Sequence, residues 1–545
     1  MKSAYHDTFA ADHLPPRDQW PDLINLDRLG YPEQVNCAAE LLDRAVAEGD
    51  GDRVVLRAPG GVAWTYRQLQ EQANRIAHTL VGDMGLRTGE RVLLFAPNNP
   101  MMVACWFGVV KAGGIVVALM PMLRAREICV MVEKAQVRHA LYDHRLAAEM
   151  TEARAKCPRL EQALAFGGGE LEARMATQSA NFDAVPTSAE DVCLIAFTSG
   201  TTGVPKGTMH FHRDVLAICD TFSQHVLRPT RDDLFIGSPP LAFTFGLGGL
   251  VLFPMRARAA TVLIEKAPPP ELAKAIEHFG ATISFTSPTG YRFMLEHCGN
   301  VNLTTLRTCV SAGETLPKAT SDAWFEKTGL RIIDGIGSTE ILHIFISAAG
   351  DDIRPGATGK AVPLYEARVI DAKGSVLPPG TVGRLAVRGP TGCRYLADDR
   401  QKKYVVDGWN VTGDAYLMDA DGYFWFQARA DDMIISSGYN ISGPEVEATL
   451  LEHPAVKECA VVGSPDAMRG AVVKAFVVLR DGHAASDHLV HELQNHVKAQ
   501  IAPYKYPRAL EFVVALPKTE TGKIQRFKLR QQEEAKAAEK NSTPA

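Results

Sequence analysis

One segment of the chain restricts the fold strongly, because its residues cannot pack into a core. Residues 198–210, "TSGTTGVPKGTMH", hold three glycines, five hydroxyl side chains and one lysine directly after the apolar run 192–197. Glycines let a backbone approach a ligand closely, and exposed N–H groups with hydroxyls suit an anion. Lys206 adds a mobile positive charge. The segment therefore predicts a phosphate-binding loop after a buried strand, with an ordinary flexible surface loop as the alternative.

This loop differs from the common phosphate-binding pattern G-x-x-x-x-G-K-[ST]. That pattern needs a glycine immediately before the lysine, and this chain has Pro205 there.

Short apolar, β-branched runs recur along the chain and indicate buried strands. Five of them stand out: 91–97, 114–120, 192–199, 233–239 and 281–288. Helical patterns lie between several of these runs. In the pattern at 65–80, Thr65 and Gln68 have the spacing of a capping box. Strands that alternate with helices predict an α/β fold with largely parallel sheets.

The length of 545 residues is too great for one hydrophobic core, so we expect at least two domains. From Asp431 onward the predicted elements become short, and Ser442 to Glu445 reads as a helix start. We predict a large domain over residues 1–430 and a small α+β domain over residues 431–545. The charged tail from Gln531 onward is expected to fray.

Composition excludes several classes of protein. The net charge of −5 argues against a nucleic-acid-binding protein. Ten scattered cysteines without a C-x-x-C pair favour reduced thiols in a cytoplasmic protein over a disulfide framework or a zinc site. The N-terminus has no apolar stretch typical of a signal peptide. The apolar run 101–123 contains Lys111 and two glycines, so we expect a helix and then a buried strand in a soluble protein rather than a membrane span.

The pair "HFH" at residues 210–212 has the look of two metal ligands. The sequence places no third ligand nearby, so we interpret His210 and His212 as packing residues.

Five motifs, taken together, resemble the adenylate-forming (acyl-CoA synthetase, AMP-binding) superfamily. They are "TSGTTGVPKG" (198–207), "GIGSTE" (335–340), "TGD" (412–414), "ARADDMI" (428–434) and "PKTETGKIQR" (517–526). The resemblance covers nearly the whole chain. The stretch "DGIGSTEILHIFISA" and the N-terminal region resemble the benzoate-CoA ligase branch, and most of all 2-aminobenzoate (anthranilate)-CoA ligases.

The resemblance implies a large N-terminal AMP-binding domain with mixed and parallel sheets flanked by helices, and a small α+β domain on a hinge. It implies an ATP-dependent aryl acid:CoA ligase that forms an aryl adenylate, then an aryl-CoA thioester, releasing pyrophosphate and AMP. ATP and CoA are the co-substrates and Mg²⁺ the cofactor. The alternative is an adenylation enzyme that loads a carrier-protein thiol. An oxygen-dependent use of the adenylate, as in luciferases, and a non-catalytic nucleotide-binding module are more distant alternatives.

The resemblance also implies roles for particular residues. Lys523, Glu340 and Lys206 correspond to catalytic positions, and Glu340 to the Mg²⁺ ligand; a helix-start carboxylate is the alternative for Glu340. The residues implied in ATP or AMP binding are Thr198, Ser199, Gly200, Thr201, Thr202, Lys206, Ala312, Gly313, Glu314, Asp334, Gly335, Ile336, Gly337, Ser338, Thr339, Asp414 and Arg429.

The acyl group is expected between the segment 238–249 and a helix following "GSTE". The implied pocket residues are Ala242, Phe243, Phe245, Gly335, His343 and Ile344. His343, three residues after Glu340, is expected on the same helical face, with a satisfied core histidine as the alternative. A small pocket with aromatic walls suits a single aromatic ring. Ile336 and Phe243 depart from the commoner family pattern, and both lie near this pocket.

The remaining implied positions are in the small domain. Asp431 corresponds to the hinge, and Ser437, Gly438 and Tyr439 to the tunnel for the CoA arm. The partners are an aromatic carboxylate, ATP and CoA, without nucleic acid or membrane. Monomer and homodimer both stay open.

Overall fold

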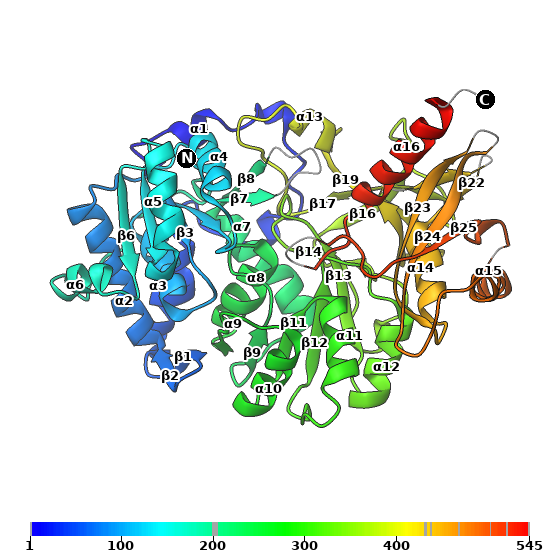
Figure 1. Ribbon diagram of the computed structural model, residues 1–545. Helices are drawn as coiled ribbons and strands as arrows, with labels where there is room; N and C mark the ends of the chain where they lie inside the picture. Colours follow the sequence, from blue (N-terminus) through cyan, green and yellow to red (C-terminus); the bar gives the residue numbers. More distant parts are fainter. Residues whose placement is uncertain are drawn as a thin grey trace.

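The computed structural model describes residues 3–198, 205–429, 433–436, 439–466, 469–501, 503–518 and 522–542. Its fold is α/β, as predicted: three sheets with flanking helices form the larger N-terminal part, and a small α+β unit follows. Figure 1 shows the chain running from the blue N-terminal lobe through the green centre to the orange and red C-terminal end.

A six-stranded sheet carries the predicted phosphate-binding segment. Its strands have the order β6-β5-β3-β4-β7-β8, and every neighbouring pair is parallel except the β7–β8 hairpin. Helices α2 and α3 pack on one face of this sheet, against Val92 and Leu94, and helices α4 and α5 pack on the other, against Leu93 and Phe95. The strand bounds are β3 Arg91–Phe95, β4 Ile115–Leu119, β5 His139–Asp143, β6 Gln162–Phe166, β7 Val192–Thr198 and β8 Lys206–Phe211.

A nine-stranded sheet forms the centre of the molecule, in the order β15-β14-β13-β12-β11-β9-β10-β1-β2. The strands from β13 through β1 are parallel, and both edges end in antiparallel strands. The bounds are β1 Val54–Ala58, β2 Val62–Thr65, β9 Leu234–Gly237, β10 Ala260–Val262, β11 Ile283–Thr286, β12 Thr308–Ala312, β13 Ile332–Gly337, β14 Ile344–Ser347 and β15 Lys360–Ala361.

An antiparallel five-stranded sheet follows. Its order is β16-β17-β19-β18, with β20 paired to β19. The bounds are β16 Glu366–Ile370, β17 Val382–Arg388, β18 Val405–Val406, β19 Trp409–Met418 and β20 Phe424–Arg429.

Among its described residues, the C-terminal unit has one hairpin, one three-stranded sheet and three α-helices. Its elements are β21 Ile434–Ser436, β22 Tyr439–Ile441, α14 Gly443–Leu451, β23 Val456–Asp466, β24 Gly470–Leu479, α15 Asp487–Gln500, β25 Ala509–Phe512 and α16 Arg526–Ser542. As expected, α14 starts at Ser442, whose side chain accepts from the Glu445 N–H. The domain boundary at residue 430 remains a prediction.

The expectation for the C-terminal tail was wrong. Residues 526–542 form helix α16, which lies along the orange strands in Figure 1. Glu533 on this helix is 5% exposed and pairs with Lys474 of β24 at 2.8 Å. This tertiary ion pair holds a charged helix that local composition alone does not stabilise.

The other helices pack between and around the sheets. Their bounds are α1 Phe9–Asp12, α2 Tyr66–His78, α3 Pro100–Lys111, α4 Ala125–Ala135, α5 Ala147–Lys156, α6 Glu170–Ala176, α7 His212–Ile218, α8 Thr244–Leu247, α9 Phe253–Arg256, α10 Pro269–Phe279, α11 Pro288–His297, α12 Lys318–Thr328 and α13 Gln401–Tyr404. Short 3₁₀ or π segments are η1 Arg17–Gln19, η2 Asp27–Leu29, η3 Ala39–Asp43, η4 Val46–Asp50, η5 Thr79–Asp83, η6 His144–Leu146, η7 Cys219–Leu227, η8 Gly248–Leu252, η9 Gly350–Asp352 and η10 Pro503–Lys505.

Local signals explain how two of these helices begin. Thr65 and Gln68 form the predicted capping box at the start of α2. Asn99 caps α3 by accepting from the Met102 N–H, and Pro100 occupies the first turn.

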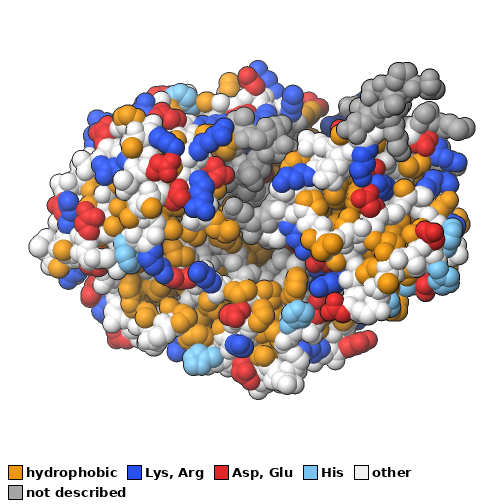
Figure 2. Space-filling model, in the orientation of Figure 1, with side chains coloured by type: hydrophobic (Ala, Val, Ile, Leu, Met, Phe, Trp, Pro, Cys, Tyr) orange, Lys and Arg blue, Asp and Glu red, His pale blue; other side chains and the backbone are white. Residues whose placement is uncertain are grey.

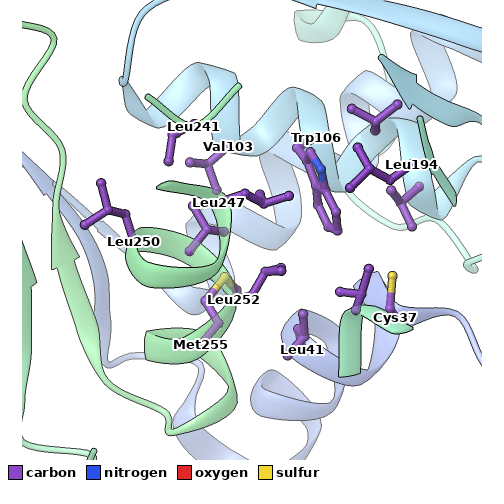
Figure 3. Packing of buried hydrophobic residues seen from close by; sticks show 14 of the residues in the cluster. Cys37, Leu41, Val103, Trp106, Leu194, Leu241, Leu247, Leu250, Leu252 and Met255 are labelled. Carbon is purple, nitrogen blue, oxygen red and sulfur yellow. The ribbon is translucent and has the colours of Figure 1, made fainter. Parts of the chain in front are cut away.

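The apolar run 101–123 forms α3 and β4, as predicted, and Lys111 at the end of the helix is buried and paired with Asp43 at 2.6 Å. Figure 3 shows Val103 and Trp106 of α3 packing towards Leu247, Leu250 and Leu252. Among the described residues, no helix is long and apolar enough to cross a bilayer.

Candidate active site

The β7–β8 hairpin places two predicted site residues opposite each other. Thr198, the last residue of β7, pairs in register with Lys206, the first residue of β8. Ser199, Gly200, Thr201 and Thr202, in the loop between them, lie outside the described residues. The Thr198 hydroxyl oxygen is buried and has no hydrogen-bond partner in the described part of the chain. A buried hydroxyl in this state is a donor available to a ligand at the loop.

Lys206 is held in a three-membered network with Tyr395 and Glu340. Its ammonium nitrogen Nζ lies 3.1 Å from Glu340 Oε1 and donates to the Tyr395 hydroxyl at 2.8 Å. The same hydroxyl donates to Glu340 Oε1 at 2.5 Å. Glu340 is 7% exposed, so a buried carboxylate is satisfied by one cation and one phenol. Burial and the negative charge of Glu340 raise the pKa of Tyr395, which keeps its donor proton.

Tyr395 is a residue that the motif search missed. It comes from a loop that runs beside β8: the Met209 N–H donates to the Arg394 carbonyl and the Leu396 N–H donates to the Gly207 carbonyl, both at 2.8 Å. An isolated bridge pairs Thr208 with Tyr395. The signal for this tyrosine is a long-range strand pairing, which a local sequence window does not contain.

The expected helix after "GSTE" does not form, and this correction changes the geometry of the site. Residues 338–342 turn back sharply, with Leu342 at φ +77°, and β14 then runs antiparallel to β13. Glu340 and His343 therefore do not share a helical face. Glu340 contacts Lys206 and Tyr395, whereas His343 packs among phenylalanine rings.

The turn is fixed by buried hydrogen bonds to its backbone. His210 Nε2 lies 2.8 Å from the Thr339 carbonyl, and the Thr391 hydroxyl donates to the Ile341 carbonyl at 2.7 Å. Burial and the charge of Arg394 lower the pKa of His210 to about 3, so its imidazole is neutral. The Ser338 hydroxyl lies 3.3 Å from that of Tyr404.

The predicted adenine-side residues lie at the carboxyl ends of β12 and β13. Ala312 pairs with Gly335, and Ser311 pairs with Asp334 and donates to its Oδ1 at 2.6 Å. Burial raises the pKa of the Asp334 carboxyl to about 7. Glu314 is occupied elsewhere, since its Oε2 accepts from the Thr289 hydroxyl at 2.6 Å.

The glycines of this region leave room for neighbouring backbone and side chains. A Cβ atom at Gly335 would lie 2.7 Å from the Ile344 side chain, and one at Gly337 would lie 2.8 Å from the His343 backbone. Ile336, between them, packs against the main core. Any larger residue at the two glycine positions would separate β13 from β14.

Lys523 of the C-terminal unit lies near the carboxyl end of β12, in the nine-stranded sheet. Gly313 has φ +87°, and a Cβ atom built on it would lie 3.5 Å from Lys523 Nζ. The lysine directly precedes Ile524, which forms an isolated bridge with Lys518, and α16 begins at Arg526. The structure thus brings together Lys523 with the segment that contains Ala312 and Gly313.

Two predicted nucleotide contacts are neighbours on the five-stranded sheet. Asp414 of β19 stands opposite Arg429 of β20. Asp431, Ser437 and Gly438 lie outside the described residues. Tyr439 opens β22 and pairs with Ser436.

The predicted acyl segment contains an aromatic cluster centred on His343. The ring centroid of His343 lies 4.5 Å from that of Phe253, 5.5 Å from Phe222 and 5.6 Å from Phe245. Ala242 and Phe243 come just before α8, which carries Phe245, and Ile344 is buried beside His343. Sequence reasoning named Phe245 and missed Phe222 and Phe253, which lie on other helices.

His343 is 3% exposed, and neither ring nitrogen has a hydrogen-bond partner of good geometry in the described part of the chain. Burial lowers its pKa to about 3, so the imidazole is neutral. The ring interacts with the Phe245 backbone without a well-formed hydrogen bond, so the alternative of a core histidine stays open. A neutral imidazole among aromatic rings is a polar group that can bind a further partner.

Figure 2 shows a hollow near the centre of one face of the molecule, with hydrophobic side chains along it and lysine and arginine side chains beside it. Positive charge around an apolar recess suits a ligand with a charged end and an apolar end.

Comparisons with known proteins decide the family. Residues 42–395 match the model for the AMP-binding enzyme family, and residues 445–523 match the AMP-binding enzyme C-terminal domain. The chain belongs to the AMP-binding, or adenylate-forming, enzyme family. It is 36% identical over 508 residues to the benzoate–CoA ligase of Thauera aromatica, which covers 92% of this chain and 96% of that protein.

Two solved structures place the enzyme in the benzoate-CoA ligase branch. The anthranilate CoA ligase AuaEII, solved with anthranoyl-AMP, has a TM-score of 0.89 and 36% identity, over 94% of this chain and 99% of that one. A benzoate CoA ligase from Burkholderia xenovorans has a TM-score of 0.83 and 31% identity, over 91% and 100% of the two chains. The enzyme is therefore an acid–thiol ligase that works through an adenylate.

Proposed function

We propose that this enzyme is an ATP-dependent aryl acid:CoA ligase for acids of the benzoate and 2-aminobenzoate class. A carboxylate oxygen of the acid attacks the α-phosphorus of ATP and pyrophosphate leaves. The CoA thiol then attacks the carbonyl carbon of the aryl adenylate, and AMP leaves. The observation that carries the proposal is the aromatic cluster around the unpaired imidazole of His343, at the end of the nucleotide-side strand β13.

For the first half-reaction, two cations come from opposite sides of the site. Lys206 stands at the end of the phosphate hairpin, and Lys523 lies against Gly313. We assign Lys206 to the β- and γ-phosphates and Lys523 to the α-phosphate and the substrate carboxylate, where negative charges must approach each other. Thr198 to Thr202 donate hydrogen bonds to the phosphates, and Thr339 and Gly337 border the same space.

We assign the adenine base to strands β12 and β13 of the nine-stranded sheet, and the ribose to strands β19 and β20 of the five-stranded sheet. Ala312, Gly313, Glu314 and the segment from Asp334 to Ser338 border adenine. Asp414 and Arg429, opposite each other on β19 and β20, bind the ribose hydroxyls.

Glu340 fits a Mg²⁺ ion, because it is a buried carboxylate whose Oε1 is already oriented by Lys206 and Tyr395. Magnesium sites of nucleotide-dependent enzymes use one or two carboxylates together with phosphates and water. Glu340 would be the protein ligand, and the ion would neutralise phosphate charge when bound. Lys206 and Tyr395 hold the carboxylate in place.

The acid is assigned to Ala242, Phe243, Phe245, Gly335, His343 and Ile344. Aromatic walls favour a flat ring. A neutral imidazole offers one N–H and one lone pair, which is the complement of an amino or hydroxyl substituent on that ring.

For the second half-reaction, we propose that the chain divides at residue 430 and has its hinge at Asp431. Rotation at this hinge would bring Ser437, Gly438 and Tyr439 of the C-terminal unit to the CoA arm.

The test is AMP release with Mg²⁺ and ATP, with and without CoA, across benzoate, 2-aminobenzoate, hydroxy- and halobenzoates, cinnamates and a medium-chain fatty acid. We expect AMP release that requires both a benzoate-type acid and CoA. Pyrophosphate exchange followed by transfer only to a carrier protein would replace the CoA assignment. Turnover with the fatty acid alone would overturn the acid class.

A further inference from the structure

We propose that Cys37, Cys193 and His212 form a buried binding site for one soft d¹⁰ cation, Zn²⁺ or Cu⁺. Among the described residues these three offer ligand atoms that all lie within 4.8 Å of one another. All three residues have no exposed surface. The site is independent of the nucleotide and acid sites, and it goes beyond the proposed reaction.

The fold brings the three ligands together from distant parts of the chain. Cys193 is the second residue of β7, at a bulge where the register with β8 shifts between Val192 and Leu194. A bulge re-aims the side chain of the extra residue. His212 opens α7 immediately after β8, and Cys37 lies just before η3. Figure 3 shows Cys37 on the segment that also carries Leu41, at the edge of the apolar core.

The distances between these side chains suit a shared ligand. His212 Nδ1 lies 3.3 Å from Cys37 Sγ and also accepts from the Cys37 backbone N–H at 3.2 Å. A nitrogen ligand about 2.0 Å and a sulfur ligand about 2.3 Å from one metal ion are separated by a distance similar to this Nδ1–Sγ distance. A cation between these side chains would bond to His212 Nδ1 in place of the hydrogen bond from the Cys37 backbone N–H.

Charge balance also suits a cation at this site, because a buried charge needs a partner of opposite sign. With Zn²⁺ both thiols release their protons to solvent, and two thiolates with a neutral imidazole give an uncharged site.

Tyr5 supplies the outer contact that histidine ligands usually have. Its hydroxyl donates to the Val192 carbonyl at 2.8 Å and lies 3.4 Å from His212 Nε2, the nitrogen that faces away from Cys37. Such partners orient a ligating ring and fix its tautomer. Thiolate and imidazole donors select Zn²⁺ or Cu⁺ over hard cations such as Mg²⁺ and Ca²⁺.

Under this proposal His212 is a metal ligand instead of the packing residue that the sequence suggested, and two of the free cysteines share its site. His210 and His212 turn to different neighbours: His210 contacts the Thr339 carbonyl and His212 contacts Cys37. The other two ligands come from outside this motif: Cys193 on β7, and Cys37, 175 residues away from His212.

The decisive measurement is the metal content of the full-length enzyme purified under reducing conditions without chelators. We expect one zinc or copper ion per chain, and the element found identifies the cation. Co²⁺ added to the metal-free enzyme should give the intense thiolate charge-transfer absorption of cobalt bound to two cysteines. This part needs no substitution, so a folding defect cannot obscure it.

Variants then assign the ligands. The double substitution Cys37→Ser/Cys193→Ser and the single substitution His212→Gln should abolish binding, with folding checked by circular dichroism. Cys219→Ser is the matched control: its thiol is equally buried and donates to the Val215 carbonyl, but it is not among the three ligands. Tyr5→Phe should weaken affinity by about 10–100-fold while the ion still binds.

Three results would overturn the site: a reduced, folded enzyme that binds neither zinc, copper nor cobalt; a Cys37–Cys193 disulfide, seen as a loss of two hydrogens in the intact mass; or full metal content in the double variant. CoA-ligase activity is not used as a readout, so failure of the proposed reaction would leave this test unaffected.

Discussion

The side-chain nitrogen of Lys523 lies 3.5 Å from the point where Gly313 would carry a Cβ atom. Gly313 has φ +87°, a conformation in which side chains are strained, so the position is doubly suited to glycine. This contact joins the C-terminal unit to the end of β12 in the conformation described. It makes a sharp prediction about which half-reaction needs the lysine.

Lys523→Ala should reduce adenylate formation by about 10²–10³-fold, because a preorganised cation is lost where phosphate and carboxylate meet. Thioester formation from a supplied aryl adenylate and CoA should be largely spared. Pyrophosphate exchange and single-turnover thioester assays measure the two steps. Lys528→Ala, an exposed lysine on α16, is the control. Equal losses in both half-reactions would show that Lys523 has another role.

Tyr395→Phe should lower kcat/KM for ATP about 10–100-fold, since a hydrogen bond to a charged group contributes about 1.5–3 kcal/mol. The hydroxyl that is removed accepts from Lys206 and donates to Glu340. Steady-state kinetics at varied ATP and Mg²⁺ measure the change. Tyr404→Phe, whose hydroxyl makes only a 3.3 Å contact with Ser338, should cost less. A larger loss in the Tyr404 variant would contradict this network.

His343→Leu should lower the ratio of kcat/KM for 2-aminobenzoate over benzoate by about tenfold, because a partner for the ring substituent is lost. The melting temperature should hold or rise, since an unpaired buried imidazole is removed. Phe245→Leu should instead weaken both acids alike. An unchanged ratio in the His343 variant would mean that the imidazole does not read the substituent.

Asp334 should make stability fall as pH rises. Its pKa is about 7 in the folded chain against an ordinary value of 3.8, so the folded state retains a proton that the unfolded chain releases. The contribution of this group to stability is therefore full below pH 3.8 and is lost as pH rises through 7. Asp334→Asn, which keeps an acceptor for Ser311, should remove that dependence.

Thermal melts of wild type and Asp334→Asn between pH 5 and 8, without nucleotide, measure the effect. Relative to the variant, wild type should lose about 1 kcal/mol per pH unit below pH 7. Asp351→Asn, at an exposed carboxylate, should follow wild type. Parallel melting curves for wild type and Asp334→Asn would refute the assignment.

Local signals predicted much of the fold, including the strand that precedes the expected phosphate loop. The capping box of Thr65 and Gln68, the cap at Ser442 and the strand before the phosphate loop depend on neighbouring residues, which a sequence window contains. Such interactions need no contact with distant parts of the chain.

The errors came where distant pairing decides the structure. The stretch after "GSTE" has helical spacing, yet pairing of β14 with β13 overrides it and turns His343 away from Glu340. Tyr395 reaches Lys206 through a bridge to β8, and Cys37 reaches His212 across most of the N-terminal lobe. The residues next to Tyr395 and Cys37 in the sequence give no signal that predicts these contacts.

The short ladder between β8 and residues 394–396 has a consequence for how this enzyme can vary. Lys206 and Tyr395 meet because the Met209 and Leu396 N–H groups lock two backbones in one register. Side chains alternate along such a ladder, so an insertion or deletion of a single residue in either segment would turn the phenol to the opposite face. We therefore expect these two segments to tolerate exchanges of residue type and to resist changes of length, even though one of them lies in a loop.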